Sequence, residues 1–159
     1  MTFNKVVFDI QTTLTADKIW CIVCKDGDTF YQFKENNLHR FEEFIKQTKE
    51  VIGHNIIGFD IPVLNRFFGY DLFKNCKITD TLVLSRLLNP MIDGGHSLKN
   101  WGIKLGHSKI EFEQFDFFSE DMLKYCRNDV DLTQRLYNFL IKRIKDFGYS
   151  IELEHEVAK

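Results

Sequence analysis

The stretch KVVFDIQ at residues 5–11 decides the fold class of this chain, because an apolar run ends there in an aspartate. Three consecutive apolar residues, Val6 to Phe8, are typical of a buried strand. Side chains two residues apart on a strand lie on the same side of the sheet, so those of Asp9 and Gln11 are expected to lie together. A carboxylate at the end of a buried strand is well placed to bind a metal ion. Gln11 offers only a neutral amide oxygen in the place of a second carboxylate.

The elements around and after this stretch predict an α/β domain. A strand is expected at residues 4–9, and residues 18–25 and 28–33 predict a hairpin around the short-turn signal Asp26-Gly27-Asp28. Apolar periodicity and capping residues then predict helices at residues 38–49, 60–68, 80–88, 97–104 and 119–146, with short strands at 51–53 and ending near Ile78. Three strands followed by helices that alternate with short strands indicate a mixed sheet covered by helices.

The composition is that of one ordinary globular domain. The chain has 159 residues, of which 44% are apolar and 28% are charged, and its 16 phenylalanines predict a Phe-rich core. The formal net charge of −2 excludes a global basic field, so nucleic-acid binding would depend on a local patch and bound cations. The N-terminal apolar run is too short for a signal peptide, and no apolar stretch approaches the roughly 20 residues of a membrane span. We therefore expect a cytoplasmic protein with no membrane partner.

The cysteines predict neither a zinc site nor a redox pair. Cys21 and Cys24 form a C-x-x-C, but they lie in a predicted strand, where residues three apart point to opposite faces. The sequence has no second C-x-x-C and no paired histidines that would complete a tetrahedral site. Buried free thiols are the expected state.

Two further aspartates lie in suggestive settings, Asp60 in the stretch HNIIGFD and Asp129 in YCRNDV. Phosphodiester hydrolysis with two divalent metals needs several oxygen ligands that converge on one point. Each aspartate also has an ordinary interpretation. Asp60 precedes Pro62 at the start of a predicted helix and could be its N-cap. Asp129 could pair with Lys124 or Arg127 as surface charge.

The combination of these stretches resembles a known family. Tyr125 lies four residues before Asp129, so the two side chains share one face of a helix. Residues 9–11, 54–64 and 125–129 look like the three motifs of the DnaQ-like (DEDD) 3′→5′ exonucleases, and the tyrosine indicates the DEDDy subgroup. The likeness covers nearly the whole chain and is strongest to the proofreading domain of family A DNA polymerases of short-tailed phages.

The resemblance implies an RNase H-like fold in residues 1–150, with a tail at 151–159 similar to the start of a polymerase domain. It implies that nucleotides are removed from single-stranded or frayed 3′ ends of DNA and released as 5′-mononucleotides. It also implies two divalent metal ions, Mg²⁺ or Mn²⁺, and a monomer that works in a bacterial host cytoplasm if phage-encoded. A separately encoded DNA polymerase is a partner that this resemblance allows.

The resemblance also assigns roles to individual residues. Asp9 would bridge both metals, Asp60 would support the second, and Tyr125 would orient the attacking water. The implied metal ligands are Asp9, Gln11, Asp60 and Asp129, and the implied contacts to the substrate are Thr12, Leu14, His54 and Asn55. Asp80 is expected to be a helix cap near the site rather than a ligand.

Gln11 departs from the family pattern, which has glutamate at this position. An amide oxygen can coordinate a cation but carries no charge, so metal binding and the activation of water are expected to weaken. We expect the chain to be nearly inactive and still to bind 3′ ends. An engineered substitution and a natural loss of activity both account for Gln11, and the sequence does not separate them.

Two alternative functions stay open at this point. The chain could be an RNA 3′→5′ exonuclease of the same superfamily, since the sequence does not locate groups that sense a 2′-hydroxyl. It could also be a non-catalytic 3′-end-binding module for a separate polymerase, which fits both Gln11 and the polymerase-like tail. The change Gln11→Glu discriminates, because a binding module would gain little activity from it.

Overall fold

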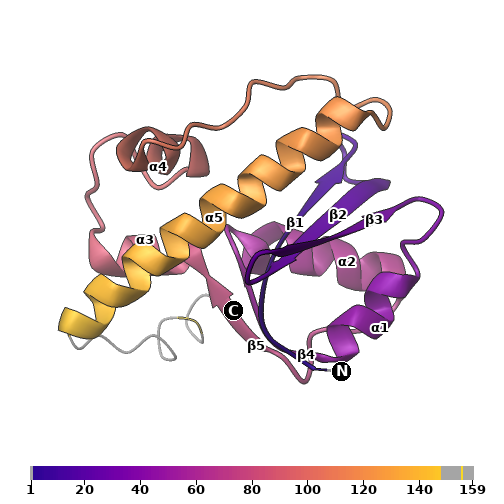
Figure 1. Cartoon of the computed structure of the whole chain (residues 1–159), viewed down its shortest axis with the longest axis horizontal. Helices are drawn as coiled ribbons and strands as arrows, with labels where there is room; N and C mark the ends of the chain where they lie inside the picture. The colour runs from indigo at the N-terminus through magenta and orange to yellow at the C-terminus, as the bar shows by residue number, and fades with distance from the viewer. Residues whose placement is uncertain (1, 148–154, 156–159) are drawn as a thin grey trace.

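One five-stranded mixed sheet forms the centre of the molecule in the computed structural model, which describes residues 2–147 and residue 155 (Figure 1). The strands are β1 (Phe3–Thr12), β2 (Ile19–Asp26), β3 (Thr29–Lys34), β4 (Thr48–Gly53) and β5 (Lys77–Asp80), arranged in the order β3-β2-β1-β4-β5. The pairs β1–β2 and β2–β3 are antiparallel, whereas β1–β4 and β4–β5 are parallel. The mixed sheet expected from the sequence is confirmed.

The register of β1 leaves its last residues beside an open flank. Pairing with β4 runs from Phe3 to Val7, whereas pairing with β2 continues from Val7 to Thr12. Asp9 and Gln11 therefore lie beyond the last β1–β4 pair, where β4 has already ended at Gly53. A side chain at Gly53 would collide with Ile56 and crowd the carbonyl of Phe8, so glycine lets the chain turn closely against β1 here.

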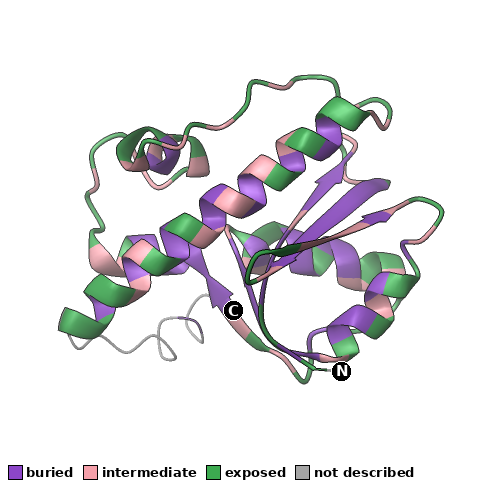
Figure 2. Ribbon diagram, viewed as in Figure 1, coloured by how far each residue is buried: buried purple, intermediate pink, exposed green. Residues whose placement is uncertain are grey.

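Helices cover both faces of the sheet, as Figure 1 shows. The helices are α1 (Arg40–Lys46), η1 (Ile56–Asp60, a π-helical turn), α2 (Ile61–Phe68), α3 (Thr81–Leu88), α4 (Leu98–Leu105) and α5 (Glu120–Phe147). Side chains from α1 and α2 pack in one core, and side chains from α3, α4 and α5 pack in the other. Long helix α5 crosses the second face with its buried stripe inward (Figure 2).

The first core is rich in phenylalanine, as the composition predicts. Phe8 of β1 stacks on Phe73 with ring centroids 5.8 Å apart, and Phe3 stacks on Phe44 at 4.5 Å. Aromatic pairs at these distances add attraction beyond the area that they bury. This core fixes β1 from one side, which matters because β1 carries the first residues of the candidate site.

The four cysteines are free, as expected. Cys21 and Cys24 point to opposite faces of β2, because Cys21 packs in the core of α5 and Cys24 in the core of α1 and α2. Burial raises the pKa of the Cys24 thiol well above its ordinary value. These observations agree with the interpretation of the C-x-x-C as strand residues rather than a metal or redox motif.

Two boundaries differ from the sequence-based expectation. The helix predicted at 38–49 ends at Lys46, and strand β4 begins at Thr48 instead of at residue 51. β-branched Thr48, Val51 and Ile52 favour a strand there. Strand β1 also continues past Asp9 to Thr12, so the chain does not turn out directly after the aspartate.

The helices predicted at 97–104 and 119–146 begin at serine caps. Ser97 accepts a hydrogen bond from the backbone of Asn100 at the start of α4, and Gly106 ends that helix with a φ of 71°. Ser119 accepts from the backbone of Met122 at the start of α5. The predicted tail at 151–159 lies outside the described residues apart from His155.

Within the described parts of the chain, no helix is long and apolar enough to span a membrane.

Candidate active site

The end of β1 brings together Asp9 and Gln11, as the two-residue period of a strand predicts. The Gln11 amide nitrogen donates to Asp9 Oδ2 over 2.8 Å. The thiol of Cys126 on α5 lies 3.4 Å from the same oxygen and 3.5 Å from the Asp9 carbonyl. Asp9 is half-buried and Gln11 is buried. Gln11 therefore presents a donor, rather than its oxygen, to the carboxylate beside it.

Asp60 reaches the same point from the π-helical turn η1. Its Oδ2 accepts a hydrogen bond from the backbone nitrogen of Ile10 over 3.3 Å, across the flank that β4 leaves open. The interpretation of Asp60 as an N-cap is wrong, because its backbone is helical and its side chain caps no helix. Single π-helical turns occur frequently at functional sites, since they re-aim one side chain. Here the turn directs a buried carboxylate toward β1.

Asp80 holds that turn in place. Its carboxylate accepts from the backbone nitrogens of Asn55 at 2.8 Å and Ile57 at 3.0 Å, and also from Leu82 at 2.9 Å. The last contact is the helix cap that the sequence predicts for α3. The first two were missed, and they support the left-handed backbone of Asn55, whose φ is 61°. Asp80 is thus a structural anchor of η1 rather than a residue of the carboxylate cluster.

Helix α5 contributes Tyr125 and Asp129 on one face. Asp129 pairs with Lys109, whose Nζ lies 3.4 Å from Asp129 Oδ2, and not with Lys124 or Arg127. The same ammonium group donates to the Tyr125 hydroxyl over 2.9 Å and lies 4.9 Å from the centre of the tyrosine ring. Lys109 follows α4 in a segment without regular structure, and its side chain is 23% exposed. The sequence analysis did not identify this position of Lys109.

The carboxylates of the cluster have too little positive charge around them to balance their own charge. Burial raises the pKa of Asp9 to about 6. Burial and then the charge of Asp9 raise the pKa of Asp129 to about 7, and the same two causes raise that of Asp60 well above its ordinary range. Burial lowers the pKa of Lys109, but the charge of Asp129 and the bond to Tyr125 outweigh it, so the net shift is upward. The cluster therefore favours bound protons or cations.

The residues present fit a divalent cation in chemistry and charge. Asp9, Asp60 and Asp129 each have a donor at Oδ2, but Asp129 Oδ1 is buried with no hydrogen-bond partner. A buried carboxylate oxygen without a hydrogen-bond partner destabilises the folded state, so a bound partner is expected there. No three His, Cys, Asp or Glu side chains of the described residues are arranged as a ready-made metal site. The side chains of Gln11 and Lys109 instead place donors beside Asp9 Oδ2 and Asp129 Oδ2.

The four predicted substrate contacts fall into two groups. Leu14 is 83% exposed beyond the end of β1, whereas Thr12 is buried and its hydroxyl bonds to the carbonyl of Thr13. His54 is held by Thr81 Oγ1 at 2.8 Å and by the His96 carbonyl at 2.9 Å. Burial lowers the pKa of His54 to about 4, so the ring is neutral near pH 7. Among the described residues, the side chains of Leu14 and Asn55 thus make no hydrogen bond of the kind that restrains Thr12 and His54.

A cavity of about 300 Å³ opens beside the cluster, on the side of Lys109 and Tyr125. It lies between α4 and the segment that leads to α5, with Phe112, Ile110 and Lys99 in its wall. Trp101 does not face it as a stacking platform, because it is buried and donates to Ser85. Phe112 and Phe115 both pack on Tyr125, with ring centroids 5.4 and 6.2 Å from that of the tyrosine.

Comparison with solved structures gives the fold a known counterpart. Two structures of NrnC from Brucella melitensis, one of them with bound Mg²⁺, match at a TM-score of 0.73 and 23% identity. A third, NrnC bound to pGG, matches at 0.73 and 21% identity. Each match covers 96% of this chain and 79% of the NrnC chain. The RNase H-like α/β fold expected from the sequence is confirmed.

Comparison with known protein families finds no match for this sequence, and comparison with curated proteins finds none either.

Proposed function

We propose that this chain is a metal-dependent 3′→5′ exonuclease scaffold whose catalytic power is reduced by Gln11. The observation that carries the proposal is that the charge of Asp9 on β1 acts on both Asp60 of η1 and Asp129 of α5, and that Asp129 has a buried oxygen without a hydrogen-bond partner. Support comes from the NrnC structures of the same fold, one with Mg²⁺ and one with pGG. The DEDDy-like order of motifs supports the same activity.

Asp9, Asp60 and Asp129 are the residues that would hold the divalent ions, with the Gln11 amide oxygen as a weaker fourth ligand. Bound ions would act as Lewis acids and lower the pKa of water near the scissile phosphate. Tyr125 would orient the attacking water through its hydroxyl, which already lies at the edge of the cluster. Ile10 and Cys126 fix the carboxylates of Asp60 and Asp9, so the cluster is held from the backbone of β1 and from α5.

The substrate class that we propose is a short or single-stranded oligonucleotide, with RNA favoured over the DNA expected from the sequence. The NrnC structure bound to pGG supports RNA. DNA ends remain supported by the resemblance to phage proofreading domains. Recognition would be local and independent of sequence, because the net charge of −2 provides no extended basic surface. Single strands would be preferred, since a paired end must first be frayed.

A non-catalytic 3′-end-binding module is the second candidate, and a specific observation favours it. Gln11 donates to Asp9, the backbone of Ile10 donates to Asp60, and Lys109 pairs with Asp129, so all three carboxylates already have internal partners. A site satisfied in this way could bind a strand end without cutting it. A separately encoded polymerase would then supply the chemistry.

Degradation of matched 5′-labelled RNA and DNA heptamers tests these proposals. This chain, Gln11→Glu and the control Gln114→Glu are compared with Mg²⁺ or Mn²⁺. Gln114 is exposed, and its oxygen accepts from the backbone of Asp116, so a glutamate there adds charge without entering the cluster. We expect only Gln11→Glu to shorten strands from the 3′ end, at least about 100-fold faster than this chain. Binding of both strands without cutting by Gln11→Glu would favour the binding module.

A further inference from the structure

Lys109 is the cation of the carboxylate cluster, and three observations single it out. Its ammonium group lies 3.4 Å from Asp129 Oδ2 and donates to Tyr125 over 2.9 Å. Its charge also acts on Asp9, whose carboxyl it helps to keep ionised. Lys109 thus contacts both α5 residues that the proposed function uses, although it comes from a separate part of the chain.

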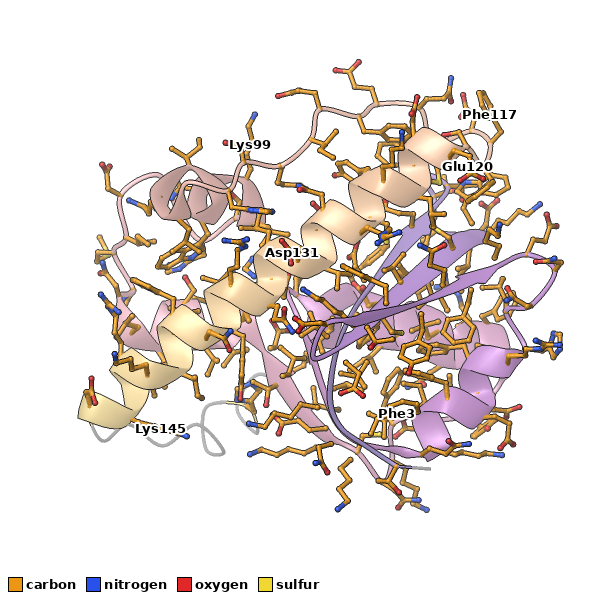
Figure 3. The ribbon with its side chains drawn as sticks, viewed as in Figure 1. Phe3, Lys99, Phe117, Glu120, Asp131 and Lys145 are labelled. Carbon is orange, nitrogen blue, oxygen red and sulfur yellow. The ribbon has the colours of Figure 1, made fainter. Side chains whose placement is uncertain are left out.

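The neighbouring aspartate on the same helix shows what a fully compensated carboxylate looks like. Asp131, labelled in Figure 3, pairs with Lys25 at 2.8 Å and with Arg135 at 3.3 Å, and His107 lies 3.4 Å away. Burial acts to raise the pKa of Asp131, but the hydrogen bond and charge of Lys25 outweigh it, so the net shift is downward. Asp129 has one lysine and one unpartnered buried oxygen instead. The negative charge of Asp129 is therefore only partly balanced, and its Oδ1 can accept another cation.

The side chain of Lys109 has room to move away from Asp129. Lys109 has a flexible four-carbon stem, sits in a segment without regular structure, and lines the 300 Å³ cavity beside the cluster. Its departure from Asp129 would expose Oδ2 next to the already unpartnered Oδ1. Two positive charges at one carboxylate repel each other, so a divalent ion at Asp129 and the ammonium group oppose each other's binding.

We propose that Lys109 is a built-in counter-cation that competes with divalent metal for Asp129 and so sets the metal affinity of the site. The inference rests on the proposed function, because it takes Asp129 as a metal ligand. In the metal-free protein Lys109 holds Asp129 and the Tyr125 hydroxyl together. When a divalent ion binds, the ammonium group moves toward the cavity, where it faces the incoming strand.

Manganese binding to four proteins tests this inference. Free Mn²⁺ is measured by electron paramagnetic resonance during titration of this chain, Lys109→Met, Lys109→Arg and Lys99→Met. Met keeps an apolar stem over the Tyr125 ring, and Arg keeps the charge. Lys99, labelled on α4 in Figure 3, lines the same cavity but has no ion pair with the cluster in the described residues, so Lys99→Met is the matched control.

We expect Lys109→Met to bind Mn²⁺ about tenfold more tightly or better, the scale seen when groups bonded to metal ligands are changed. Lys109→Arg and Lys99→Met should bind as the parent chain does. The sign is decisive, because a lysine that merely supports the fold would weaken metal binding when removed. Unchanged or weaker binding by Lys109→Met overturns the inference, and so does the lack of Mn²⁺ binding by all four proteins.

A second variant covers the case in which Lys109→Met does not fold. Lys109→Gln can still donate to Tyr125 while it lacks the charge, and it should also bind Mn²⁺ more tightly. The two proposals fail in different ways. If Gln11→Glu cuts strands but the affinity for Mn²⁺ is the same with and without Lys109, only this inference is wrong. If affinity rises as expected but no strand is cut, the exonuclease proposal is wrong and the competition stands.

Discussion

Replacing Gln11 by glutamate should make the stability of the protein depend on metal. The Gln11 amide nitrogen lies 2.8 Å from Asp9 Oδ2, so Gln11→Glu puts a second carboxylate in contact with the first. Two unit charges about 4 Å apart repel by about 4 kcal/mol at an effective dielectric constant of about 20. Uptake of a proton limits that cost. Because the pKa of Asp9 is about 6, protonating this carboxyl at pH 8 costs two pH units, or about 3 kcal/mol.

Thermal unfolding in EDTA at about pH 8 measures this cost. For a domain of this size, about 3 kcal/mol corresponds to a Tm lower by about 6–12 °C. The difference between Gln11→Glu and the parent should disappear near pH 5, where the native site already binds its proton, and also in about 10 mM Mg²⁺. The control Gln114→Glu should unfold like the parent under every condition. An unchanged Tm in EDTA, or a loss that Mg²⁺ does not restore, would refute the reasoning.

Three further predictions address the supports of the cluster. The pKa of Asp129 is raised to about 7, so its ionised carboxylate destabilises the folded protein as the pH rises from about 4 through 7. The Tm of Asp129→Asn in EDTA should therefore increase relative to that of the parent over this range. A Tm difference that does not depend on pH would contradict the assignment. Asp80→Ala removes the acceptor of three backbone nitrogens and should lower stability by about 2–4 kcal/mol in urea unfolding, whereas the exposed control Asp71→Ala should cost less than half as much. Tyr125→Phe in the Gln11→Glu background should lower kcat about tenfold or more with little change in Tm. A change in KM with kcat unaltered would indicate a role in binding alone and would point away from a role in orienting water.

The part of the site on β1 could be predicted from sequence because a strand has a fixed two-residue period. Once residues 5–11 are taken as a strand, Gln11 must lie beside Asp9, although the period does not predict that its amide nitrogen donates to Asp9. The pairing of Tyr125 with Asp129 follows in the same way from the helical spacing of four residues. Both inferences depend only on local geometry, and the apolar pattern specifies that geometry directly.

Asp60 and Lys109 could not be placed in this way, for two different reasons. An aspartate before Pro62 fits a helix cap as well as a ligand, and only the π-helical turn makes the side chain point to the backbone of Ile10. Lys109 lies in a segment without periodicity, 16 residues from Tyr125, so no local rule connects the two. The overlong helix predicted at 38–49 has a different cause, since the helical spacing of apolar residues is extended past Lys46 over Thr48, where β4 begins.

The charge of the cluster links Gln11 and Lys109 to the number of metal ions that the site can hold. Three carboxylates against one ammonium group leave two formal negative charges, which one divalent cation balances. A glutamate at position 11 raises the deficit to three, and the departure of Lys109 raises it to four, which two divalent cations balance. A buried cluster tolerates little uncompensated charge, so these two side chains act on metal occupancy together. The neutral amide and the internal lysine therefore have the same physical effect: they let the site remain folded with less metal than the proposed two-ion mechanism would require.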